Sequence, residues 1–147
     1  MLAKVLDAKV LNSGEIFRSV SYYLKKNNVD FENTTSVINC AKNFEYKKIS
    51  SSKLYSRDID LISSKISMIP RLRKITIKIQ KDFVKLNKNR TKTIIAEGRD
   101  MGTVIFPKAD VKIFMWAKAE IRAKRRLFQL NKSMKTGEYN SICLLYT

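Results

Sequence analysis

The 147 residues of this sequence are enough for one domain with one core, and 44% of them are hydrophobic, as in globular rather than disordered proteins. The 30 basic and 13 acidic residues give a net charge of +17, which favours anionic partners, although the scattered lysines indicate a solvated surface more than a nucleic-acid-binding patch. Histidine is absent, which excludes Ser–His and Cys–His nucleophiles. The two cysteines, Cys40 and Cys143, lie far apart, so a zinc site or a disulfide framework is not expected.

The first part of the chain is predicted to contain the end of a helix at residues 1–6 and a short strand at residues 8–12. Residues 14–27 are predicted to form a helix because apolar residues recur at helical spacing. These apolar residues are Ile16, Val20, Tyr23 and Leu24. Ser13 is placed where it could cap this helix. Residues 28–56 are polar, and their pattern predicts no definite element.

Two helices are predicted in the middle of the chain. Residues 57–68 carry isoleucines that fall on one helical face. These are Ile59, Ile62, Ile66 and Ile69. Pro70 suits the first turn of a new helix. Residues 70–87 fit both strand alternation and helical spacing, but their length favours a helix.

The last part of the chain is predicted to contain two strands and a basic helix. Residues 93–96 and 111–116 lack alternation, which is typical of parallel strands buried on both faces. Residues 118–132 are predicted to form the helix, and its apolar positions are Ile121, Leu127 and Leu130. This order of elements predicts an α/β fold, with a parallel sheet wrapped by helices.

One segment, residues 97–110, contains two of the four glycines and one of the two prolines. It places Arg99 and Asp100 side by side between Gly98 and Gly102, directly after a predicted strand. Charged residues flanked by glycine at the end of a buried strand are typical of ligand sites in open α/β sheets. A loop without a ligand could have the same composition, so the pattern leaves both interpretations open.

Four segments of the chain, taken in order, resemble the cytidylate kinases, which transfer the γ-phosphoryl group of ATP to CMP or dCMP. Residues 97–110 resemble the signature of that family. Residues 11–18 are similar to its Leu-Asp-Ser/Thr-Gly-x-x-Tyr-Arg segment, and residues 63–73 to the segment that begins Ala-Ser and ends Pro-x-Val-Arg. Residues 119–126 are similar to the helix that enters the family's lid. The resemblance implies the fold of a P-loop nucleoside monophosphate kinase in incomplete form.

The resemblance implies that Arg18 and Arg99 bind the phosphate of CMP and serve catalysis, and that Ser13 lies against the substrate. The planar fork of arginine bonds two phosphate oxygens at once and stays charged. Taken singly, Arg18 could be a solvated charge on a helix. A helix cap would fully explain Ser13.

The resemblance also implies that Ser64, Arg73 and Asp100 read the cytosine, because together they can accept from its amine and donate to its carbonyl and ring nitrogen. Each has a simpler explanation when taken singly. Arg73 could be a solvated charge, Ser64 is one serine among several, and Asp100 could pair with Arg99 or cap a turn.

Some positions depart from the family or lie at the edge of the resemblance. Asn12 stands where the family has Asp, which removes a carboxylate near the phosphate site, and Phe17 replaces Tyr. Arg122, Arg125 and Arg126 lie where the lid begins. They could steady the transferring phosphoryl group, or they could form the basic, solvated face of a helix.

The Gly-rich G-x-x-x-x-G-K-[ST] loop that holds ATP phosphates does not occur in the sequence. The resemblance therefore implies Mg²⁺ with ATP as cofactors but assigns no ligand for them, and residues 1–147 by themselves are expected to have little or no kinase activity. We expect one partial cytidylate kinase-like domain. Its parts are core pieces at 1–27 and 88–117, a CMP-binding side at about 28–87, the start of a lid at about 118–132 and a divergent tail at 133–147.

The expected function is that of a (d)CMP kinase in pyrimidine nucleotide metabolism, acting as a cytoplasmic monomer on CMP or dCMP and ATP. No apolar run approaches the about 20 residues of a membrane span and no secretory signal is recognised, so neither a membrane nor a specific nucleic acid is expected as a partner. Two alternatives stay open: a non-catalytic remnant that binds CMP, and a small basic nucleic-acid-binding protein.

Overall fold

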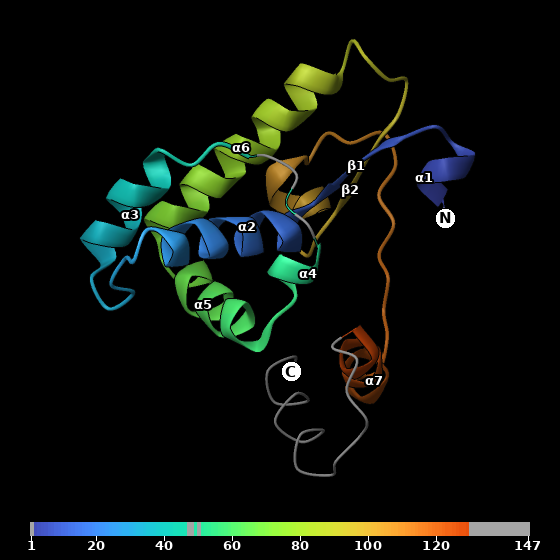
Figure 1. Ribbon diagram of the computed structural model, residues 1–147. Helices are drawn as coiled ribbons and strands as arrows, with labels where there is room; N and C mark the ends of the chain where they lie inside the picture. Colours follow the sequence, from blue (N-terminus) through green and yellow to red (C-terminus); the bar gives the residue numbers. More distant parts are fainter. Residues whose placement is uncertain (1, 47–48, 50, 130–147) are drawn as a thin grey trace. The chain divides into compact units, whose positions relative to one another are not determined.

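The computed structural model describes residues 2–46, 49 and 51–129 (Figure 1). The chain divides into one unit that ends at Asp110 and a second that begins at Val111. The elements of the first unit are α1 (Leu2–Val5), β1 (Lys9–Asn12), α2 (Ser13–Lys26), α3 (Thr34–Lys42), α4 (Ser51–Leu54), α5 (Arg57–Ser67), α6 (Pro70–Asn87), β2 (Ile94–Glu97) and the short π-helical turn η1 (Met101–Ile105). The second unit contains α7 (Ala119–Gln129).

Strands β1 and β2 form a parallel pair, in which Lys9 lies opposite Ile94 and Asn12 lies opposite Glu97. Helices α2 to α6 lie between the two strands in the sequence, so a helical crossover connects β1 to β2 (Figure 1). This arrangement confirms the predicted α/β class. Leu11 is buried but Val10 is 42% exposed, so only one face of β1 is covered in the part of the chain that the structure describes. A sheet buried on both faces was expected and is not found there.

The core lies among α2, α3, α5 and α6, where each helix turns an apolar face inward. Its buried residues are Val20, Leu24, Val37, Ala41, Phe44, Ile66 and Leu72. The ring of Tyr23 packs edge-on against Phe44, with centroids 5.4 Å apart. The apolar faces predicted for residues 14–27 and 57–69 are confirmed, since Ile59 is also buried and Ile62 and Ile69 pack against the core.

The predicted helices at 14–27, 57–68 and 70–87 are all present, with Pro70 in the first turn of α6. The predicted cap of α2 is wrong by one residue. Asn12 occupies the cap position, and its side chain accepts a hydrogen bond of 3.1 Å from the backbone N–H of Glu15. The polar segment 28–56, for which no element was predicted, contains α3 and α4.

The predicted strand at residues 111–116 is wrong. None of the described residues pairs with it, and a strand forms only where a neighbour satisfies its backbone groups. The side chains of Phe114 and Trp116 are 91% and 75% exposed. In α7, Ile121 is 44% exposed, whereas Ala123 is buried. The other two predicted apolar positions, Leu127 and Leu130, lie outside the side chains that the structure describes.

Candidate functional site

The parallel pairing of β1 and β2 brings together the residues that follow each strand. Asn12 and Glu97 are opposite each other at the strand ends, and the Asn12 amide donates a hydrogen bond of 3.1 Å to the Glu97 carboxylate. Ser13 and Gly98 come next. A Cβ atom at Gly98 would overlap the hydroxyl of Ser13 and lie 3.0 Å from the Cβ of Ser13. The structure thus places Ser13 directly against the segment that carries Arg99 and Asp100.

The lack of a side chain at Gly98 is therefore required by the close approach of Ser13. We expect Gly98→Ala to lower the free energy of unfolding by about 1–3 kcal/mol, as overpacking does in close-packed sites. In a protein that already carries Ser13→Gly, the overlapping side-chain atoms are absent. Adding Gly98→Ala to it should therefore lower the free energy of unfolding much less. Urea unfolding of the four proteins measures the coupling. Equal losses in both backgrounds would contradict the close approach.

Asp100 is positioned by the turn that follows it. Its backbone carbonyl accepts hydrogen bonds from the N–H groups of Val104 and Ile105, at 3.0 and 3.1 Å. The buried side chains of Met101 and Ile105 anchor the turn η1. The carboxylate of Asp100 is thereby presented at the start of a fixed turn.

Arg73 of α6 lies against Asp100, with its Nη2 atom 2.6 Å from the Oδ2 atom of the carboxylate. The side chain of Arg73 is 51% exposed and that of Asp100 is 42% exposed, so solvent reaches both. Two of the three residues predicted to read cytosine are therefore in contact and accessible. Their charged groups provide hydrogen-bond donors and acceptors at one place.

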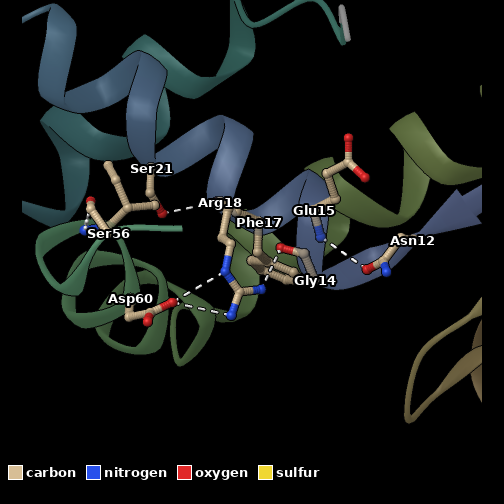
Figure 2. A network of polar contacts seen from close by, with 9 residues as sticks. Asn12, Gly14, Glu15, Phe17, Arg18, Ser21, Ser56 and Asp60 are labelled. Atoms are coloured by element: carbon tan, nitrogen blue, oxygen red, sulfur yellow. Dashed lines mark hydrogen bonds and ion pairs between the residues drawn. The ribbon is translucent and has the colours of Figure 1, made fainter. Parts of the chain in front are cut away.

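Arg18 extends from α2 toward α5 (Figure 2). Its Nε and Nη2 atoms both lie 3.1 Å from Oδ1 of Asp60, and its Nη1 atom donates to the carbonyl oxygen of Gly14 at 3.1 Å. The guanidinium carbon lies 5.2 Å from the centre of the Tyr55 ring. The side chain of Arg18 is only 18% exposed. Sequence reasoning did not single out Asp60, because one carboxylate on an amphipathic helix looks like any solvated charge.

The remaining two predicted residues, Ser64 and Arg99, are exposed. The backbone carbonyl of Ser64 accepts a hydrogen bond of 2.8 Å from the Ser67 hydroxyl. Within the described residues, no hydrogen bond or ion pair joins the side chain of Ser64 or Arg99 to the other four predicted site residues. Their roles stay predictions.

Five of the six predicted site residues nevertheless belong to one continuous strip of the first unit. Arg18 contacts Gly14, Ser13 approaches Gly98, and Asp100 contacts Arg73. Peptide bonds connect these contacts, through Ser13–Gly14 and through Gly98–Arg99–Asp100. The strip presents three guanidinium groups and a carboxylate, which suits a ligand that has both an anionic group and a polar base.

The three arginines at the start of the predicted lid belong to the second unit. Arg122 and Arg125 are exposed, as expected of a solvated helix face, but Arg126 is only 5% exposed. No group of three His, Cys, Asp or Glu side chains that could hold a metal ion is found among the residues that the structure describes. Within that part of the chain, no helix has the length and apolar character needed to cross a membrane.

The parallel strand pair, with charged residues gathered where both strands end, is the arrangement of an α/β ligand-binding protein. The family model described as cytidylate kinase matches residues 1–144. The chain therefore belongs to the cytidylate kinase family, as its four motifs predicted.

Individual members of the family show the same relationship. A cytidylate kinase of Mycoplasmopsis synoviae is 32% identical over 97% of this chain and 68% of its own length. A cytidylate kinase of Bartonella bacilliformis is 33% identical over 90% of the chain and 60% of its own length. Cytidylate kinase 2 of Haemophilus influenzae is 31% identical over 96% of the chain and 68% of its own length. The chain thus spans 60 to 68% of the length of these relatives.

Proposed function

We propose that this chain forms the acceptor site of a (d)CMP kinase. CMP or dCMP would bind along the strip that joins Arg18 to Arg73 and accept the γ-phosphoryl group of ATP, giving ADP and CDP or dCDP in pyrimidine nucleotide metabolism. The observation that carries the proposal is the contact between Arg73 and Asp100, 2.6 Å apart and open to solvent, next to the junction of Ser13 and Gly98.

The strip offers groups for both parts of the nucleotide. Arg18 and Arg99 would supply positive charge for the phosphate, and Ser13 would offer a hydroxyl. Asp100 can accept a hydrogen bond from the exocyclic amine of cytosine, and Arg73 can donate to the ring nitrogen and carbonyl. Uracil carries a carbonyl where cytosine carries the amine, so UMP would present an acceptor to a carboxylate and be rejected.

ATP and Mg²⁺ belong to the same proposal but are not assigned to residues of this chain. Mg²⁺ bound to ATP would neutralise charge on the phosphates during transfer. Among the described residues, no group of three His, Cys, Asp or Glu side chains lies together to hold that ion.

Thermal unfolding in the presence of nucleotides tests the proposal. CMP and dCMP should raise the melting temperature more than UMP or AMP at equal concentration. A ligand at a hundred times its dissociation constant stabilises the folded state by about 2.7 kcal/mol. Cytidine, which lacks the phosphate, is the control and should give a much smaller shift. Equal shifts for all four nucleotides would show that the site does not read cytosine.

A further inference from the structure

The carboxylate of Asp60 has no role in the proposed site, yet it contacts Arg18, one of the two residues proposed to bind the phosphate. One oxygen of Asp60 accepts a hydrogen bond of 3.1 Å from Nε of Arg18 and forms an ion pair with Nη2, also at 3.1 Å. The two side chains are 18% and 20% exposed, so solvent screens this pair less than the Lys25–Asp58 and Arg73–Asp100 pairs. Asp60 lies on α5 and Arg18 on α2, so the contact joins two helices (Figure 2).

The contacts of Arg18 restrict it from three directions. Asp60 binds one edge of the guanidinium group, Gly14 accepts from Nη1, and the ring of Tyr55 lies on its face, 5.2 Å from the central carbon. A guanidinium group has five N–H donors, and the hydrogen bonds to Asp60 and Gly14 use one on Nε and one on Nη1. Further N–H groups on the two Nη atoms are left to donate to a phosphate.

We propose that Asp60 is a positioning residue, which holds the guanidinium group of Arg18 in the orientation that accepts the phosphate of the nucleotide. This inference rests on the proposed function, since it assigns to Asp60 a role in the same acceptor site. A long arginine side chain loses rotamer freedom when it binds a ligand, and prior fixing by Asp60 lowers that cost. The competing interpretation is that Asp60 occupies Arg18 and repels the phosphate.

The hydrogen bond of Asp60 can be separated from its charge. Asp60→Asn removes the charge but keeps an oxygen that can accept the hydrogen bond from Nε of Arg18. Asp60→Ala removes the charge and the acceptor together. The difference between these two variants therefore isolates the hydrogen bond, because both have lost the same negative charge.

Asp58 provides a matched control. It lies two residues away on the same helix and also pairs with a basic residue of α2, since its Oδ2 atom lies 2.8 Å from Nζ of Lys25. It does not contact Arg18. Asp58→Ala and Asp58→Asn thus change the same net charge and the same pair of helices without touching the proposed phosphate site.

The experiment measures CMP affinity by isothermal titration calorimetry for the original chain and the four variants, each first shown to be folded by thermal unfolding. Asp60→Ala is expected to bind CMP about two- to tenfold more weakly than Asp60→Asn, the cost of ordering one long side chain on binding. Asp60→Asn should bind at least as tightly as the original chain, and the two Asp58 variants should not differ from each other. If Asp60→Ala does not fold, Asp60→Ser replaces it, because the serine hydroxyl is too short to reach Arg18.

The outcomes distinguish this inference from the proposed function. If the original chain binds CMP but Asp60→Ala binds it as tightly as Asp60→Asn, or more tightly, the positioning role is overturned and the proposed function is not. An equal difference between Ala and Asn at Asp58 would also overturn it, because the effect would then belong to the helix and not to Arg18. Absence of CMP binding by the folded original chain would overturn the proposed function, and the role of Asp60 with it.

Discussion

Replacing Asp100 with alanine is expected to abolish the preference for CMP over UMP while leaving the stability of the protein almost unchanged. The ion pair with Arg73 is about half exposed, and such pairs contribute only about 0–1 kcal/mol to folding. In the complex, by contrast, loss of the carboxylate leaves the amine of cytosine without its acceptor, which costs about 1–3 kcal/mol. Every 1.4 kcal/mol corresponds to a factor of about ten in affinity.

Calorimetric titration with CMP and UMP measures this preference. Arg99→Ala is the informative comparison, because a contact with the phosphate carries no information about the base. That variant should bind CMP, UMP and AMP more weakly by the same factor. Asp82→Ala is the control for charge, since Asp82 is an exposed carboxylate on α6, the helix that carries Arg73. An unchanged preference in Asp100→Ala would mean that Asp100 does not read the base.

Replacing Leu72 with alanine is expected to cause a large loss of stability. Leu72 is fully buried in the core cluster formed by α2, α3, α5 and α6. Removing three buried carbon atoms loses their transfer free energy and leaves a cavity, and Leu→Ala changes of this kind cost about 2–5 kcal/mol. Urea unfolding followed by circular dichroism gives the free energy of unfolding for each protein.

The same helix offers a control for this change. Leu86 also lies on α6, but its side chain is 67% exposed. Leu86→Ala should therefore change the free energy of unfolding by no more than about 0.5 kcal/mol, as surface substitutions usually do. If both variants lost the same amount, the core would not lie where the structure places it. Since Leu72 is one residue from Arg73, its loss should also weaken CMP binding.

Much of the helical structure could be predicted from local pattern. The isoleucines of residues 59–69 and the apolar spacing of residues 16–24 are properties of single helices, and both faces are buried as expected. Pro70 marked the start of α6 because its ring suits a first turn and no later one. The cap of α2 was misplaced by one residue, since Asn and Ser are both good caps and only the backbone geometry selects between Asn12 and Ser13.

The strands show where local pattern is insufficient. The short apolar runs at 94–96 and 111–116 look alike in sequence. Only the first is a strand, because β1 provides its backbone partners, and no described residue does so for the second. A helix satisfies its hydrogen bonds within its own segment, whereas a strand depends on a neighbour that sequence pattern does not reveal.

The same distinction holds for the candidate site. The sequence by itself, through its four motifs, determined the family and named Arg18, Arg73, Arg99 and Asp100 as candidates. Only the tertiary structure brought Arg73 to Asp100 across 27 positions and Ser13 against Gly98. It alone showed that Asp60 contacts Arg18, which lies 42 positions earlier in the chain. Charged contacts of this kind depend on which helices pack together, and that packing is decided by the buried apolar faces rather than by the charges themselves.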